Sequence, residues 1–283
     1  MPNYTYLRLG DRLPTVGVVQ RLLNAHGIVI DVDGVFGRDS VEAVMQFQQM
    51  KHIRVTGEVD MHTWALLAYR ARLEILDCVD VSFDRTLFPV RRSGETSAHF
   101  RHRTEAYHTG AASLARNEYQ QLHTIGADVI AIGGTSNGLQ VALEEIARRL
   151  TPHHVLLRIH GHGIRGMAGI STGEELMGAE GSVFNLENIR ANRTLLQQVG
   201  DKLYPSGSVQ LMHCNVAGGT VGRRLLETMA EMMFVPVSAG INYQLGGGEH
   251  TFKFEGPTYT AVPGSDSLRS WSGNLMTAAM GTL

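Results

Sequence analysis

The chain is poor in cysteine, with Cys78 and Cys214 alone among its 283 residues. Two cysteines are too few for a disulfide framework, so we expect two free thiols. The formal net charge of -2 gives no electrostatic reason to expect nucleic acid or an anionic membrane as a partner. No run of about eighteen apolar residues predicts a membrane span, and residues 1–10 lack the apolar region of a signal peptide. These absences predict a soluble chain made in the cytoplasm.

The remaining composition is that of a chain able to bury a substantial core. Hydrophobic residues make up 43% of the sequence and charged residues 18%, which is ordinary for a globular protein. The length allows two domains. Changes in the hydrophobic pattern divide the chain into residues 1–75, 76–125 and 126–283.

Residues 1–75 have the pattern of a small helical unit. Apolar residues recur at helical spacing over residues 16–23, and Gly27 then provides a stop. A turn at residues 33–37 precedes a second helix, and a third short helix carries Trp64. The second and third parts form a loose repeat, in which a turn is followed by a helix with an aromatic anchor.

Several short segments of this unit follow one family pattern in order. They are Leu7-Arg8-Leu9-Gly10, Val19-Gln20, Asp33-Gly34-Val35-Phe36-Gly37, Ala43-Val44, Phe47-Gln48 and Thr63-Trp64-Ala65-Leu66. The unit resembles the three-helix peptidoglycan-binding domain of bacterial cell-wall hydrolases. The resemblance implies peptidoglycan as a partner. A spacer or pro-segment is the alternative role, since most of the motif positions are core and turn residues.

The next segment loses this periodicity. Over residues 77–103, five arginines mix with serine, threonine and glycine, which predicts a linker or exposed loop. Residues 105–122 then have the pattern of a helix. We therefore assign residues 76–125 as a linker with a lead-in helix.

From residue 127, strand patterns and helix patterns alternate. This alternation predicts an α/β domain with a mainly parallel sheet covered on both faces. A hairpin near the sheet edge is predicted at residues 251–259, and a long substrate-framing loop at residues 167–187. The predicted strands are residues 127–133, 154–159, 209–213 and 235–240, and the predicted helices are residues 139–150, 189–203 and 221–233.

Two of these strands end in residues with chemical potential. The strand at residues 209–213 stops at Cys214, and the strand at residues 154–159 is followed by His160-Gly161-His162-Gly163. Open α/β sheets place their working groups at the carboxyl ends of strands. A helix beginning just after Cys214 would favour its thiolate. A thiol and an imidazole at neighbouring strand ends are the parts of a cysteine nucleophile with its base.

Two motifs extend this interpretation, His162-Gly163-Ile164-Arg165-Gly166 and Cys214-Asn215-Val216-Ala217. With the strand order, they are similar to the caspase-like cysteine peptidase fold, in its bacterial branch with a Cys-Asn-Val-Ala motif. The resemblance implies that Cys214 attacks a carbonyl carbon and that His162 protonates the departing amine. The backbone N–H groups of Gly163 and Cys214 would receive the oxyanion. A dyad of this kind needs no third residue and no cofactor.

Two other histidines compete for a place in this site. His160 sits on the strand and is expected to point away from the reacting pair, whereas His162 carries the matching glycines. His213 precedes Cys214, so strand alternation sends its side chain to the opposite face. Zinc binding by these three histidines and Cys214 is the rival chemistry. We expect no metal, because alternation separates His213 from Cys214 and no zinc-protease carboxylate motif occurs.

The predicted protein is a bacterial cysteine peptidase or amidase that hydrolyses peptide or amide bonds in the cell wall through a thioester. A secreted proteolytic effector or zymogen acting on proteins is the second hypothesis, and an inert peptidoglycan-binding protein is the third. A wall-binding domain without a signal peptide implies action in the envelope, in the periplasm or outside the cell after non-standard export.

Overall fold

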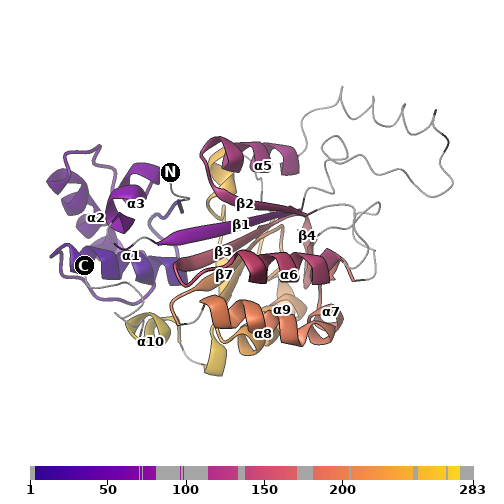
Figure 1. Cartoon of the computed structure of the whole chain (residues 1–283). Helices are drawn as coiled ribbons and strands as arrows, with labels where there is room; N and C mark the ends of the chain where they lie inside the picture. Colours follow the sequence, from indigo (N-terminus) through magenta and orange to yellow (C-terminus); the bar gives the residue numbers. More distant parts are fainter. Residues whose placement is uncertain are drawn as a thin grey trace.

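The computed structural model describes residues 4–69, 71, 73–80, 96, 98, 114–132, 138–170, 181–203, 205–244, 248–265 and 267–274. A mainly parallel sheet lies at the centre, with helices on both sides and the N-terminal helices at one end (Figure 1). The predicted α/β class, with a small helical N-terminal unit, is confirmed. No helix in the described part of the chain is long and apolar enough to span a membrane.

The N-terminal unit is built from the three predicted helices. Pro14 occupies the first turn of the first helix, where its missing N–H costs nothing. The side chain of Asp60 caps the third helix by accepting the N–H of Thr63 at 2.8 Å. Phe47 and Trp64 are fully buried between the helices. The helices are α1 (Pro14–Ala25), α2 (Arg38–Met50) and α3 (Met61–Ala68).

The loose repeat predicted in this unit is seen as two matching polar contacts. The side chain of Gln20 accepts the N–H groups of Asp33 and Gly34 and donates to the carbonyl of Val35. Gln48 binds the turn at residues 56–58 in the same way. The middle residue of each turn is a glycine at positive φ, 73° and 74°. Each glutamine thus fixes the turn that precedes a helix, α2 for Gln20 and α3 for Gln48.

The central sheet has six strands in the order β2-β1-β3-β7-β8-β9. All neighbours are parallel except β8 and β9, which are antiparallel. A small antiparallel sheet, β4-β5-β6, follows the end of β3. The central strands are β1 (Glu74–Asp80), β2 (Asp128–Ile132), β3 (His154–His160), β7 (Ser208–Met212), β8 (Val237–Gly240) and β9 (Thr258–Ala261). The small sheet is formed by β4 (Gly163–Ile164), β5 (Met167–Gly169) and β6 (Val183–Phe184).

Strand alternation gives the sheet two differently covered faces. On the first face, side chains such as Leu157 and Leu211 pack against the amphipathic helices α6, α8 and α9. Helix α5 lies on the opposite side of the sheet (Figure 1), where its Leu122 meets Val79. These helices and the remaining elements are α5 (Leu114–Thr124), α6 (Gly138–Arg149), α7 (Leu186–Ala191), α8 (Arg193–Leu203), α9 (Gly219–Met233), η1 (Gly248–Thr251), η2 (Pro263–Ser265) and α10 (Leu268–Gly273).

Part of the second face of the sheet is in contact with the N-terminal unit. Ile75, Leu156 and Met212 belong to the same buried cluster as Phe47 and Trp64. Helix α10 packs against α1. The turn at Gly34 is also close to α10, because a methyl group at Gly34 would lie 2.8 Å from the Leu268 side chain. The two predicted domains therefore share a buried hydrophobic cluster.

Three expectations from the sequence are corrected. Residues 76–80 were assigned to the linker, but they lie in β1, a buried strand between β2 and β3. The single helix at residues 189–203 is two helices, α7 and α8, separated at Asn192. The prediction of a hairpin at residues 251–259 is wrong. The strand residues of that segment belong to the antiparallel edge strand β9, which begins at Thr258 and pairs with β8. The rest of the linker, residues 81–113 apart from 96 and 98, lies outside the described residues.

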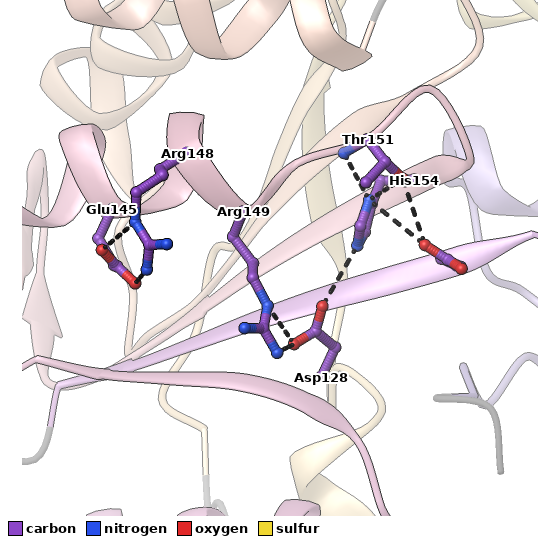
Figure 2. A network of polar contacts seen from close by, with 7 residues as sticks. Asp128, Glu145, Arg148, Arg149, Thr151 and His154 are labelled. Atoms are coloured by element: carbon purple, nitrogen blue, oxygen red, sulfur yellow. Dashed lines mark hydrogen bonds and ion pairs between the residues drawn. The ribbon is translucent and has the colours of Figure 1, made fainter.

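Polar side chains hold the amino-terminal edge of the sheet together (Figure 2). His154, buried at the start of β3, accepts the N–H of Thr151 at 3.0 Å and lies 3.7 Å from Asp128. Arg149 donates to the same Asp128 at 2.8 Å. These contacts fasten the start of β2 to the loop before β3. The candidate chemistry lies at the other end of the strands.

Candidate active site

His162 and Cys214 each follow the carboxyl end of one of two neighbouring strands, β3 and β7. The two strands are parallel neighbours, and His160 pairs with Met212. His162 and Cys214 each come two residues after this last pair, where the chains have left the central sheet. In the sheet, β2 lies on one side of β1 and β3 lies on the other, so the strand order reverses direction at β1. Open α/β sheets bind ligands at the carboxyl ends of strands beside such a switch point.

Cys214 lies in a tight turn directly after β7 and is partly exposed. Its sulfur accepts the backbone N–H of Gln244 and donates to the carbonyl of the same residue, both at 3.3 Å. Asn215 has a left-handed backbone, with φ of 55°, which turns the chain sharply after the cysteine. The N–H of Asn215 donates to the carbonyl of Asn242 at 2.8 Å. Helix α9 starts only at Gly219, so a short turn separates it from Cys214.

His162 precedes the hairpin formed by β4 and β5. Its carbonyl accepts the N–H of Gly169 at 2.8 Å, which ties it to the far end of β5. The N–H of Gly166, in the hairpin turn, donates to the carbonyl of Val216 at 3.0 Å. The loop that carries the histidine is therefore bonded to the loop that carries the cysteine.

Gly163 is the point of closest approach between these loops. A methyl group in its place would lie 2.7 Å from the side chains of His213 and Val216 and 2.9 Å from the carbonyl oxygen of Cys214. Because His162 and Gly169 form a hydrogen-bonded pair, the adjacent Gly163–Ala168 pair is of the non-bonded kind. The N–H of Gly163 consequently points away from β5. Glycine at this position allows contact between the loops and leaves a donor outside the hairpin.

Three buried polar side chains, those of Asp77, Arg158 and His160, form a hydrogen-bonded cluster on the second face of the sheet. Arg158 donates to both carboxylate oxygens of Asp77, at 2.7 and 2.9 Å, and His160 binds the same carboxylate at 2.8 Å. Burial alone would raise the pKa of Asp77, but the Arg158 charge and the hydrogen bond with His160 outweigh it and lower this pKa. Arg158 also donates to the carbonyl of Tyr4 at 2.9 Å, which connects the N-terminal unit to the sheet. His160 is thus committed to Asp77.

The remaining sequence-predicted residues fall outside the reacting pair. His213 is fully buried while its neighbour Cys214 is partly exposed, in keeping with strand alternation. In the described part of the chain, no three His, Cys, Asp or Glu side chains are arranged to hold a metal ion. Cys78 is a free thiol in the core, and burial, together with the charges of Asp80 and Asp77, raises its pKa.

Two parts of this arrangement were missed in the sequence. Gln244 touches the cysteine through its backbone, which leaves no side-chain signal to read. Asp77 interrupts an apolar run from Ile75 to Val79. That run predicts a strand once a buried carboxylate is accepted within it.

Comparison with known proteins matches both halves of the chain to families. Residues 12–67 match the family described as "Putative peptidoglycan binding domain", which confirms the predicted nature of the N-terminal unit. Residues 118–250 match "Domain of unknown function (DUF4347)". No curated protein matches the chain. The first match suggests a role related to the cell wall, and the second leaves the chemistry of residues 118–250 to be inferred from the site.

One solved structure shows a partial likeness, that of the Burkholderia AP3 phage endolysin. It is 24% identical, covers 44% of this chain and has a TM-score of 0.22. The match spans 50% of the endolysin chain. A likeness at this level carries no argument about the fold or the activity.

Proposed function

We propose that the protein is a cysteine hydrolase that cleaves amide or peptide bonds in bacterial peptidoglycan. The observation that carries this proposal is the position of His162 and Cys214. They stand at equivalent places on neighbouring strand ends, with their loops bonded to each other. A nucleophile and its proton-transfer partner need this kind of shared, fixed position.

The reaction would proceed in two steps through a thioester. The Cys214 thiol gives its proton to His162, and its sulfur attacks the carbonyl carbon of the scissile amide. The C–N bond then breaks as His162 passes that proton to the departing amine. Water then attacks the thioester, gives up a proton to His162 and releases the carboxylic acid and the thiol. The N–H groups of Gly163 and Cys214 would bind the oxyanion that forms in each step.

The substrate class is inferred from the N-terminal unit. A domain that matches a peptidoglycan-binding family is packed on the sheet that carries the proposed dyad. Binding the wall polymer would hold its stem peptides near the site and raise their effective concentration. Action in the cell envelope, in the periplasm or outside the cell follows from such a substrate.

The proposal is tested by incubating purified sacculi, and separately a peptide library, with the full chain. Mass spectrometry would identify newly formed amino groups and released fragments. The wild type and Cys78→Ala should cut stem-peptide amides, whereas Cys214→Ala should not. Cleavage of the library without cleavage of sacculi would favour the protein-substrate hypothesis. No cleavage of either substrate, or equal cleavage by Cys214→Ala, would remove the proposed chemistry.

A further inference from the structure

His213 lies directly beneath the segment that carries His162, and the proposed mechanism gives it no role. Its side chain is completely buried. A methyl group at Gly161 would lie 3.0 Å from His213 Nε2, and one at Gly163 would lie 2.7 Å from His213 Cβ. The two glycines that flank His162 therefore both pack against the His213 side chain. Any larger residue at either position would push the segment away from it.

A short chain of hydrogen bonds continues from His213 to His162. His213 Nε2 lies 2.9 Å from the carbonyl oxygen of Gly169. The N–H of Gly169 in turn donates to the carbonyl of His162 at 2.8 Å. Because a carbonyl oxygen only accepts, His213 must carry its proton on Nε2. Gly169, through its own N–H and carbonyl groups, thus connects the buried imidazole to the backbone of the proposed general acid.

The surroundings keep His213 in this neutral form. Burial lowers its pKa to about 3, the charges of His160 and His162 act in the same direction, and only the bond to Gly169 opposes them. The Asp80 side chain also approaches Gly161 from the end of β1. His213 therefore remains a constant donor across the pH range in which an ordinary histidine titrates.

Stability alone does not account for a histidine at this position. His213 Nδ1 is buried and has no hydrogen-bond partner in the part of the chain that the structure describes. An apolar side chain of similar size would fill the space without burying that nitrogen. The feature that only a polar side chain supplies is the donor at Nε2.

We propose that His213 is a positioning residue that fixes His162 opposite Cys214 by donating its Nε2–H to the Gly169 carbonyl. This inference rests on the proposed function of the dyad. It assigns no proton transfer to His213 itself. The imidazole sets the height and direction of the segment from Gly161 to Gly163, and so the place from which His162 acts.

The test compares two substitutions of His213 that differ in whether they keep a hydrogen-bond donor. His213→Gln retains an N–H donor at about the reach of Nε2, whereas His213→Met retains the volume without the donor. We expect kcat to fall about tenfold to a hundredfold in His213→Met with little change in KM, because small displacements of a reacting group cost this much. His213→Gln should stay within a few-fold of the wild type. Thermal unfolding of both variants shows whether they are folded.

A second measurement needs no substrate and separates the two proposals. The rate of Cys214 alkylation by iodoacetamide should fall in His213→Met to the level of His162→Ala, and it should be retained in His213→Gln. A wild type that cleaves nothing but shows this pattern would remove the proposed function and leave the positioning role in place. Unchanged kcat and alkylation in His213→Met, or equal losses in both variants, would overturn the role of His213.

If His213→Met fails to fold, the wild-type protein still decides the question. Nitrogen NMR of the imidazole should show a neutral ring protonated on Nε2 from pH 5 to 8. A ring that titrates in this range, or one protonated on Nδ1, would contradict the proposal.

Discussion

His160 and His162 are two residues apart, and we expect their substitution to affect different properties, stability for His160 and catalysis for His162. His160 is buried against Asp77, so its loss leaves the buried Asp77–Arg158 pair short of one partner. We expect His160→Ala to lower the free energy of unfolding by about 2–4 kcal/mol. His162→Ala should leave that free energy nearly unchanged and reduce kcat about a hundredfold to ten-thousandfold. Chemical denaturation and steady-state kinetics on both variants would test this, and the reverse pattern would exchange their roles.

Asp11, in the N-terminal unit, gives stability an unusual pH dependence. Burial raises the pKa of Asp11 from 3.8 to about 6, in spite of the hydrogen bond from the Arg8 N–H. The folded state therefore holds this proton more tightly than the unfolded state does. Its contribution to stability is full below about pH 3.8 and is lost as the pH rises through about 6.

Asp11→Asn should remove this pH dependence. At pH 7.5 we expect it to raise the free energy of unfolding by about 1–2 kcal/mol, after discounting for partial exposure to solvent. The gain over the wild type should disappear towards pH 4. Denaturation at several pH values measures the difference, with the exposed Glu42→Gln as the matched control. A gain independent of pH would show that Asp11 does not carry the effect.

The hairpin of β4 and β5 is the element on which the site depends most. A side chain at Gly163 would meet His213, Val216 and the carbonyl of Cys214. We expect Gly163→Ala to reduce kcat at least about tenfold, because the hairpin must move away from the cysteine loop. Gly37→Ala, where a methyl group meets nothing within 4 Å, is the control for a glycine substitution. Full activity in Gly163→Ala would show that the loops need not touch.

The same elements show how far the sequence could lead. The helices of the N-terminal unit and the ends of β3 and β7 were predicted, because their signals are local periodicity and motifs at strand ends. Strand β1 was missed because Asp77 breaks its apolar run, and the partners of that carboxylate lie more than 80 residues later. The contact of the Cys214 sulfur is with backbone atoms of Gln244, 30 residues later, so no side chain in the sequence indicated it. Pairings between distant residues are what a single sequence hides.

At the scale of the whole molecule, the shared buried cluster predicts that the two halves fold as one unit. Trp64 in α3 and Leu156 in β3 belong to one buried cluster, so the N-terminal unit and the sheet should unfold together. A fragment limited to residues 1–75 would end inside β1 and would expose this cluster. For that reason, binding to sacculi is better measured with the full chain.

Trp64→Ala tests this coupling. We expect a loss of about 3–5 kcal/mol and a single thermal transition shifted to lower temperature, with the signals of helices and sheet lost together. Leu66→Ala, on the exposed side of the same helix, should shift the transition little. Calorimetry that resolves two transitions, only one of them moved by Trp64→Ala, would show that the halves are independent.

The joint action of His162 and Cys214 is tested most directly by the alkylation rate of Cys214 in the full-length protein. Peptide mass spectrometry can follow iodoacetamide labelling of both cysteines near neutral pH without any substrate. Cys214 should react at least about tenfold faster than the buried Cys78, and His162→Ala should lower the Cys214 rate by about tenfold. Labelling of Cys78 first, or a Cys214 rate unaffected by His162→Ala, would contradict the dyad.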